Sequence, residues 1–359
     1  MNRILINGNF LCRNLTGIER FAFETCRQLD ELLEKQDGLE IEISILVPRN
    51  ARSVPEYKHI KLIYSPKEIH GFPFWDMGTF AKTCKSSKFL GVNFSNTSPL
   101  GKLCGLSFIH DVYAKDFPKD FHTFKDKLVK LYCRISYWNI AHNAKKVLTV
   151  SEFSKKRIMH WYGTSEDKIA VIPNGWEHFN NVVPDENVFN KFPILQQKEF
   201  FFTLGSLQKR KNLKWILEYA KSHPQDLFAV SGKAISGMHS EEIGDLKKID
   251  NVVLLGYVSD EEVKALMKKC KAFVFPTYYE GFGIPPLEAL STGTKIIVSD
   301  IASLQEIYGK SAVYINPNDT NVNLNELMKK ETSSPVEVLS KYTYCNAAKE
   351  LLKVISASY

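Results

Sequence analysis

The chain contains 359 residues and carries a formal net charge of +7, with 44% hydrophobic and 24% charged residues, as is typical of a soluble globular protein. This length exceeds the size at which one hydrophobic core usually stops growing, so it predicts two α/β lobes. No apolar run is long enough to span a bilayer, and the run Ile4–Ile6 is too short for the core of a signal peptide. We therefore expect a cytoplasmic protein rather than an integral membrane protein.

The cysteines bear on whether the protein binds zinc or forms disulfides, and the net charge bears on which partners it attracts. The seven cysteines are odd in number and include no Cys-x-x-Cys pair, so they predict neither a disulfide framework nor a zinc site. The positive charge would attract an anionic membrane, a nucleic acid or a phosphorylated small molecule, and charge alone does not choose among them. Lysine and arginine are spread along the chain without a known nucleic-acid-binding motif, so we expect no nucleic acid as a partner.

Short runs rich in β-branched residues alternate with helical patterns along almost the whole chain, which predicts parallel sheets with crossover helices. The first series of predicted strands is Arg3–Asn7, Glu42–Val47, Ile60–Tyr64, Phe89–Asn93, Leu106–His110, Lys146–Val150 and Ala170–Ile172. The second series is Phe200–Leu204, Leu227–Ser231, Val252–Leu255, Ala272–Phe275, Lys295–Val298 and Ala312–Ile315.

The gap between the two series predicts the domain organisation. Residues 173–197 begin with Pro-Asn-Gly and show little periodicity, as expected of a connector. We predict a first lobe at 1–180, a linker at 181–197 and a second lobe at 198–334. Residues 335–359 predict a helix without a strand partner in the second series, so this helix is a candidate to cross back onto the first lobe.

Two positions in the first lobe are candidates for a ligand site. Gly17 follows the first predicted strand, where it permits a close backbone approach, but one glycine is far short of G-x-G-x-x-G and does not support dinucleotide oxidation. His110 follows the strand that begins at Leu106, at a carboxyl end where α/β sheets bind ligands. A lone histidine is more often structural, so both a structural and a catalytic role stay open for it.

Residues 124–138 predict a helix that carries four cations among aromatic and aliphatic residues: Lys125, Lys127, Lys130 and Arg134. We expect part of its apolar stripe to pack on the first lobe. A structural helix with a solvated basic face is the favoured interpretation, and a helix that binds an anionic membrane is the alternative.

The second lobe holds two loops with stronger signals. After the strand that ends at Leu204, a glycine is followed by three consecutive cations. Considered by itself, Lys209 is best explained as a solvated residue. The cluster as a whole predicts a diphosphate site. After the strand that ends at Phe275, a glycine-bearing loop leads through two prolines into a helix, an arrangement that presents backbone N–H groups to phosphate. Glu280 and Glu288 bracket this loop and predict hydrogen bonds to sugar and ribose hydroxyls. Taken singly, Glu280 would be interpreted as a solvated loop acid and Glu288 as an acid at a helix start, where the helix dipole favours it.

On these residues the chain resembles the retaining glycosyltransferases of family 4, which assemble bacterial surface polysaccharides. The segment from Glu280 to Glu288 is similar to the E-x₇-E motif of the family, with the usual Gly-Phe-Gly interior. Residues 204–212 are similar to its glycine-plus-basic motif, and His110-Asp111 together with 150–154 and 172–175 are similar to three further motifs. The resemblance implies an α/β fold of the GT-B type, with two Rossmann-like parallel-sheet lobes facing each other across a cleft.

The resemblance also implies roles for the candidate residues. Arg210 and Lys211 would neutralise the donor diphosphate, Glu280 would contact hydroxyls of the transferred sugar, and His110 would lie near the reacting sugar. These four are the candidate catalytic residues. The candidate donor-binding residues are Glu288, which would hold the ribose, and Gly17, Gly205, Ser206, Gly281, Phe282, Gly283 and Ile284. Many members carry arginine where this chain has Ser206, so Arg210 is the proposed substitute for that cation.

Substrates and cofactors follow from the same resemblance. The sequence contains no Asp-x-Asp, the metal-binding carboxylate pair of GT-A enzymes, so we expect no metal ion and no cofactor besides the nucleotide-sugar substrate. The resemblance also implies retention at the anomeric carbon. The favoured donor is GDP-mannose, with UDP- or dTDP-linked hexoses or 6-deoxyhexoses as alternatives. The implied acceptor is a saccharide or lipid-linked saccharide for O-antigen or capsule, reached by peripheral contact with the inner face of the cytoplasmic membrane.

Three rival functions stay open at this stage. A GT-B-like sugar-nucleotide epimerase would act without an acceptor. A glycosidase would need two carboxylates across the scissile bond, and only Glu280 and Glu288 could serve, which makes it a weaker candidate. A nucleic-acid-binding protein is prompted only by the basic isoelectric point.

Overall fold

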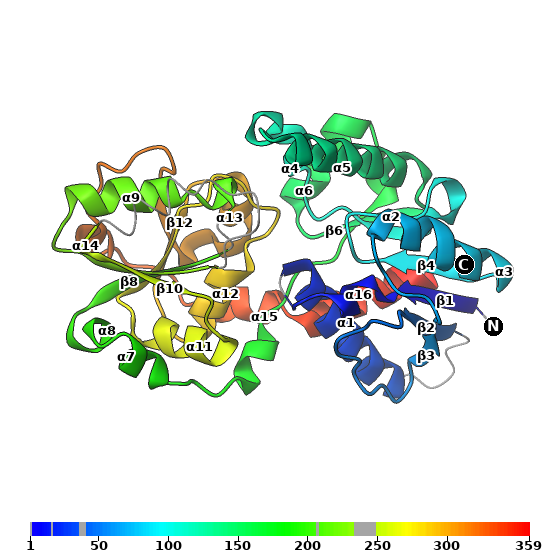
Figure 1. Cartoon of the computed structure of the whole chain (residues 1–359), viewed down its shortest axis with the longest axis horizontal. Helices are drawn as coiled ribbons and strands as arrows, with labels where there is room; N and C mark the ends of the chain where they lie inside the picture. Colours follow the sequence, from blue (N-terminus) through cyan, green and yellow to red (C-terminus); the bar gives the residue numbers. More distant parts are fainter. Residues whose placement is uncertain (1, 16, 36–40, 206–207, 233–248) are drawn as a thin grey trace. The chain divides into compact units, whose positions relative to one another are not determined.

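The computed structural model describes residues 2–15, 17–35, 41–205, 208–232 and 249–359. The chain forms two compact units (Figure 1), the first made of Met1–Gly175 and Tyr342–Tyr359 and the second of Trp176–Lys341. Each unit has its own parallel sheet, as the two series of strands predict. None of the helices in the described parts of the chain has the length and hydropathy that a membrane-spanning helix needs.

The first unit contains a seven-stranded sheet in the order β3-β2-β1-β4-β5-β6-β7, in which every neighbouring pair is parallel. Its strands are β1 Asn2–Asn7, β2 Ile41–Val47, β3 Lys61–Tyr64, β4 Leu90–Asn93, β5 Leu106–Phe108, β6 Lys146–Thr149 and β7 Ile169–Val171. All seven predicted strands of the first series are therefore present, with ends that differ by one or two residues.

Helices connect these strands. They are α1 Gly17–Glu34, α2 Phe72–Phe74, α3 Ala81–Ser86, α4 Tyr113–Asp116, α5 Phe124–Asn143 and α6 Glu152–Tyr162. The first unit also contains α16 Tyr344–Ser356, which comes from the end of the chain. Single 3₁₀ turns occur at Gly8–Cys12, Gly101–Cys104, Pro118–Asp120 and Glu166–Lys168, and a π-helical turn occurs at Trp75–Phe80.

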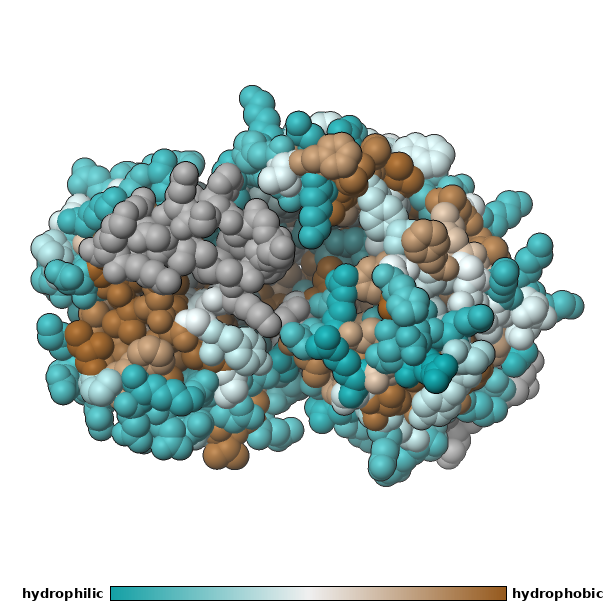
Figure 2. All heavy atoms as spheres, viewed as in Figure 1, coloured by the Kyte–Doolittle hydropathy of each residue, from teal (hydrophilic) through white to brown (hydrophobic). Residues whose placement is uncertain are grey.

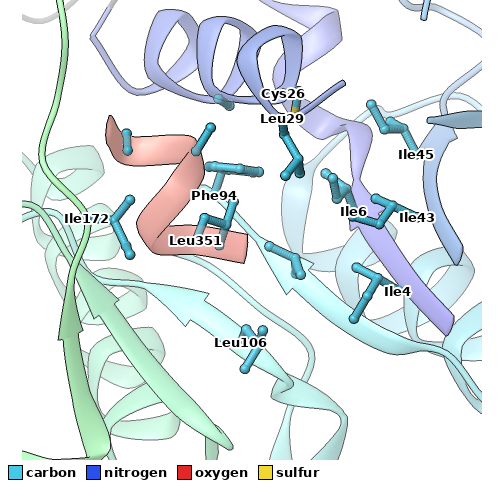
Figure 3. Packing of buried hydrophobic residues seen from close by; sticks show 14 of the residues in the cluster. Ile4, Ile6, Cys26, Leu29, Ile43, Ile45, Phe94, Leu106, Ile172 and Leu351 are labelled. Atoms are coloured by element: carbon cyan, nitrogen blue, oxygen red, sulfur yellow. The ribbon is translucent and has the colours of Figure 1, made fainter. Parts of the chain in front are cut away.

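The last helix, α16, completes the core of the first unit. Its buried residues recur at helical spacing, since Tyr344, Ala347, Ala348, Leu351, Leu352 and Ile355 share one face. This face packs with α1 against the sheet (Figure 3), where Leu351 lies in one cluster with Leu29, Ile6 and Phe94. The ring of Tyr344 lies 6.4 Å from that of Phe21 on α1. Helix α16 belongs to the first unit for this reason, although it follows the second unit in sequence.

The second unit contains a six-stranded parallel sheet in the order β10-β9-β8-β11-β12-β13. Its strands are β8 Phe200–Leu204, β9 Leu227–Ser231, β10 Val252–Gly256, β11 Ala272–Phe275, β12 Ile296–Ser299 and β13 Val313–Ile315. Its helices are α7 Asn187–Lys191, α8 Ile194–Gln197, α9 Leu213–Ser222, α11 Asp260–Lys269, α12 Ile284–Ser291, α13 Ala302–Tyr308, α14 Leu324–Leu327 and α15 Val336–Lys341. Single 3₁₀ turns occur at Glu177–Asn181, Lys209–Lys211 and Gly309–Ser311.

The unit boundaries differ from the domain limits that the sequence indicates. The chain enters the second unit at Trp176 rather than after a linker at 181–197, and those residues carry α7 and α8. These helices are short, but they bury Val188, Phe189 and Leu195, so they are part of the second unit's structure. The segment predicted as one helix from 335 is divided into α15 and α16, and the chain leaves the second unit between Lys341 and Tyr342.

Candidate active site

The second sheet brings two predicted loops together at its carboxyl edge. β8 and β11 are neighbours, and the chain continues from β8 to β9 on one side and from β11 to β12 on the other. The strand order therefore reverses between β8 and β11, and open parallel sheets bind ligands at such a point. The loops that follow these strands, 205–212 and 276–283, contain most of the predicted donor-binding residues.

Hydrogen bonds hold these two loops together. The Arg210 carbonyl accepts from the N–H of Tyr278 at 3.0 Å. The side-chain amide of Asn212 donates to the carbonyls of Pro276 at 2.9 Å and Pro317 at 2.8 Å. Asn212 precedes α9 in a left-handed conformation, with φ 57°, but its side chain makes these bonds instead of capping the helix. Residues 208–212 are thus held against residues 276–283 within one unit.

Glu280 binds both of the cations predicted to hold phosphate. Its Oε2 accepts from Nη1 of Arg210 at 2.7 Å, and its Oε1 accepts from Nζ of Lys211 at 2.6 Å and from the Thr277 hydroxyl at 3.1 Å. The Glu280 side chain is only 7% exposed, so it is not a solvated loop acid. Burial alone raises the pKa of Glu280, but the charges of Arg210 and Lys211 together hold it below its ordinary value. The carboxylate is therefore ionised at neutral pH.

Lys211 is positioned by packing as well as by charge. Its ammonium lies 4.8 Å from the centre of the Phe275 ring, a cation–π distance. Its methylene groups lie 3.4 to 3.6 Å from the place that a Cβ on Gly205 would occupy, so the glycine leaves room for them. A small pocket beside them is lined by Thr203, Leu204, Gly205, Lys211, Leu213, Ser231 and Phe275.

A tight turn carries the chain from Glu280 into α12. Phe282 is buried, and Gly283 has φ 88°, a conformation that side chains with a Cβ rarely adopt. A Cβ on Gly283 would also lie 2.8 Å from Cδ2 of Leu304, so the position requires glycine. Gly281 lies in the same turn, and Ile284 begins α12, whose first turn has no side-chain cap. The predicted strand–loop–helix arrangement is present.

Glu288 lies in the middle of α12 rather than at the helix start, and it is buried. Its Oε1 is 3.2 Å from Nε2 of His178, which is also buried. His178 is not among the residues that the sequence predicts for the site. The only signal was its place just after the Pro173-Asn174-Gly175 turn, because a contact across 110 positions leaves no trace in a single sequence.

The two first-unit candidates have different surroundings. Gly17 begins α1 with φ 42°, and a Cβ there would have no atom within 4 Å, so the position is open. His110 is buried and stacks on Phe108 with ring centres 5.2 Å apart. Its Nε2 lies 2.6 Å from the Phe94 carbonyl, which can only accept, so Nε2 carries the proton. Burial lowers the pKa of His110 to about 4, which leaves Nδ1 as an acceptor at neutral pH.

This pKa predicts a pH dependence of stability. Since the pKa of His110 is about 4 in the folded protein and about 6.5 in the unfolded chain, the unfolded chain binds more protons between these values. The free energy of unfolding should therefore fall as pH falls from about 6.5 to 4, by up to about 3 kcal/mol. Urea melts of the wild type and His110→Gln at several pH values test this. An equal loss in both proteins would assign the effect to other groups.

The remaining candidate donor-binding residue, Ser206, lies outside the described residues. Among the described residues, no three His, Cys, Asp or Glu side chains gather as a metal-ligand group. Arg210, Lys211, Glu280 and Glu288 all belong to the second unit, and His110 and Gly17 belong to the first.

Two family models match successive parts of the chain. The model described as Glycosyltransferase Family 4 matches residues 15–178, and the model described as Glycosyl transferases group 1 matches residues 184–344. Together they cover nearly the whole chain. The chain belongs to glycosyltransferase family 4. The boundary between the two matches falls close to the start of the second unit at Trp176, so each model corresponds to one unit.

Among the curated relatives of this family 4 chain is the O-antigen chain mannosyltransferase RfbU of Salmonella typhimurium. The two are 33% identical over 217 residues, which are 59% of this chain and 56% of that protein. The O-antigen chain mannosyltransferase B of Escherichia coli is 28% identical over 224 residues, or 59% of this chain and 57% of that protein. The matched part of the chain thus spans little more than half the length of these relatives.

Solved structures show the same fold at low identity. HepE of Anabaena, solved in complex with UDP and glucose, has a TM-score of 0.69 at 13% identity and covers 99% of this chain and 100% of that chain. WaaG, a glycosyltransferase involved in lipopolysaccharide biosynthesis, has a TM-score of 0.65 at 15% identity and covers 98% of this chain and 95% of that chain. The GT-B fold that the sequence predicts for this family 4 member is confirmed.

Proposed function

We propose that the protein is a retaining glycosyltransferase that moves mannose from GDP-mannose to a saccharide or lipid-linked saccharide during O-antigen or related surface-polysaccharide assembly. Its relatives in Salmonella and Escherichia coli are named as O-antigen mannosyltransferases, which supports both the sugar and the product class. A lipid-linked acceptor places the reaction at the inner face of the cytoplasmic membrane, with the protein bound peripherally.

The cluster of Arg210, Lys211 and Glu280 carries this proposal. Departure of a nucleoside diphosphate from the anomeric carbon leaves negative charge on the phosphate, and two cations fixed at the ligand-binding edge of a sheet can stabilise that charge. Each such donor lowers the barrier by about 3 kcal/mol. Retention follows if the acceptor attacks from the face that the diphosphate leaves, while the departing phosphate oxygen takes the acceptor proton.

Two further groups act as hydrogen-bond acceptors in the proposed reaction. Glu280 is ionised, so it accepts hydrogen bonds from hydroxyls of the transferred sugar and does not serve as an acid. His110 is neutral, and its Nδ1 accepts from a hydroxyl of the reacting sugar. Gly17, with no side chain and open space around it, admits the donor phosphates or the acceptor.

A panel of nucleotide sugars tests the proposal. At 100 times its dissociation constant, the true donor adds about 2.7 kcal/mol to the free energy of unfolding, which a thermal-shift assay detects. GDP-mannose should give the largest shift, and release of GDP should depend on an added acceptor. Turnover of the nucleotide sugar that does not respond to any acceptor would favour an epimerase instead. Product anomers determined by NMR test retention separately.

Glu288 is proposed to hold the ribose, with His178 as the group that orients its carboxylate. This contact is remote from the bond that breaks and is equal in ground and transition states, so Glu288→Gln should raise the donor KM by about tenfold and change kcat little. His178→Asn should raise KM in the same direction by a smaller factor. Steady-state kinetics with varied donor measure both effects. Wild-type KM values in both variants would remove the ribose assignment.

Cations of the protein are proposed to take the place of a metal ion at the diphosphate. We therefore expect activity to persist in excess EDTA, with less than a twofold change in kcat. The measurement is the transfer rate in metal-free buffer before and after addition of Mg²⁺ or Mn²⁺. A strict requirement for either ion would contradict this proposal while leaving the transferase assignment in place.

A further inference from the structure

Helix α5 leaves most of its length outside the core of the first unit. A capping box fixes its start, because the Thr123 hydroxyl accepts from the N–H of Asp126 and the Asp126 carboxylate accepts from the N–H of Thr123. The fully buried residues of the helix all lie between Ser136 and Ala141. The first three turns therefore contain no fully buried side chain, although they are rich in large apolar residues.

These apolar residues form one exposed stripe. The α5 stripe consists of Phe124, Leu128, Leu131, Ile135 and Trp138, each between 50% and 78% exposed. Their spacing of four, three, four and three residues places them within an arc of about 80° at 100° per residue. Ile140, which is fully buried, lies about 160° from the centre of that arc. The helix thus packs on the first unit through its opposite face, where Tyr137 is buried and Cys133 is partly buried in the same cluster as Ile140. The expectation that part of the apolar surface of this helix packs on the first lobe is therefore confirmed, and the α5 stripe is the part that does not pack there.

Cations flank the α5 stripe. Lys127, Lys130 and Arg134 lie along one side of it and Lys125 lies on the other, on the same helical geometry. The acids of this region are engaged, since Asp126 belongs to the capping box, Asp120 accepts from the Tyr113 hydroxyl at 2.7 Å, and Asp116 pairs with Arg157. Helix α5 itself carries these four cations against one acid, Asp126, so its surface has a net positive charge.

Aromatic rings connect the end of the α5 stripe to α6. Figure 2, viewed from the same side as Figure 1, shows apolar residues gathered over α5 with polar residues beside them. At the end of the stripe, the Trp138 ring stacks on His142 at 4.7 Å, and His142 meets Tyr162 of α6 edge-on at 6.4 Å. Amphipathic aromatic rings of this kind favour the boundary between water and lipid.

The positive charge beside the exposed α5 stripe favours an anionic lipid surface, rather than a second copy of the chain, as the partner that covers the stripe. In an isologous pair the same patch faces itself, so cations beside the stripe would meet cations of the other copy. Helix α5 offers only one acid, Asp126, to compensate its four cations. An anionic leaflet instead attracts the lysines and arginine while the stripe enters the headgroup region.

We infer that the α5 stripe and its flanking cations are the surface through which the protein docks on an anionic lipid leaflet. The inference deepens the proposed function, on which it rests for the lipid-linked acceptor, and names the helix that makes the peripheral contact. Docking through α5 would hold the first unit at the leaflet where such an acceptor is embedded.

Flotation of the full-length protein with vesicles tests this inference. The vesicles contain phosphatidylcholine alone or phosphatidylcholine with phosphatidylglycerol. One variant replaces three residues of the stripe, Leu128, Leu131 and Ile135, by glutamine. Its control replaces two apolar residues of the other unit that are more exposed than these, Val183 and Tyr257. A second variant replaces Lys125, Lys127 and Arg134 by glutamine, and its control removes three exposed lysines elsewhere on the first unit, Lys82, Lys85 and Lys349.

The wild type and both controls should float with the anionic vesicles. Each cation removed should weaken binding roughly fivefold, and the stripe variant should lose binding to both vesicle types. Release of nucleoside diphosphate with a water-soluble acceptor should stay at the wild-type rate in every variant, which separates failure of docking from failure of the proposed function. Absence of wild-type binding, or unchanged binding of the stripe variant, would overturn the inference. So would a wild-type dimer in light scattering that the stripe variant converts to a monomer.

Discussion

Lys211→Met is expected to lower kcat/KM for the donor by about 100- to 1000-fold. The substitution keeps the length and the packing beside Gly205 and Phe275, and it removes the ammonium that lies 2.6 Å from Glu280. With one cation left, the charge that develops on the departing diphosphate is only partly stabilised. Steady-state kinetics with saturating acceptor measure the effect.

Lys209→Met is the matched control for this prediction. Lys209 lies in the same 3₁₀ turn and is exposed, so the same change there should alter kcat/KM by less than threefold. Equal losses in both variants would mean that the loop contributes general positive charge rather than one positioned cation. Wild-type kinetics in Lys211→Met would remove the diphosphate assignment.

Glu280→Gln should lower kcat by about 10- to 100-fold, the usual worth of a hydrogen bond to a charged group. The structure adds a second expectation, because the carboxylate is the counter-ion of Arg210 and Lys211. A diphosphate can replace a missing counter-ion, so the variant should bind nucleoside diphosphate more tightly than the wild type does. Calorimetric titration with GDP measures this affinity, and product release should then become slower.

Glu218→Gln, on α9 of the same unit, is the control for the loss of one acid. Stability needs a separate measurement, because the lowered pKa of Glu280 means that its ion pairs stabilise the fold above about pH 4 and are lost as pH falls further. Thermal melts above and below that pH show whether the variant is folded. Weaker GDP binding by a folded Glu280→Gln variant would contradict the counter-ion role.

The sheets were predictable because their signal is local. Strands such as β8 and β11 are short runs of apolar and aromatic residues bounded by glycine or proline, and each was predicted within about two residues. The short helices α7 and α8 were missed because they depend on a few buried contacts, such as those of Phe189 and Leu195, rather than on periodicity. Tertiary packing decides such segments.

The sequence singles out the members of the Arg210, Lys211 and Glu280 cluster as candidates, but it does not show how they pair. Arg210 and Lys211 stand out as cations after a strand, and Glu280 as an acid in a glycine loop. That the acid binds both cations depends on β8 and β11 being neighbours, which the sequence does not state. The contact of His178 with Glu288 and the outward orientation of the α5 stripe also depend on tertiary structure, which a single sequence does not show.

The order in which segments of the chain form the two units has a consequence for biosynthesis. Residues 176–341 form one continuous insertion within the first unit, whose own core needs Tyr344, Leu351 and Ile355 from α16. A ribosome therefore delivers the whole second unit before it delivers the helix that closes the first. Until then, the apolar faces of α1 and of the first sheet stay uncovered, which is the condition under which nascent chains aggregate or recruit chaperones. The first half of the protein to be translated is thus the last to reach its native state.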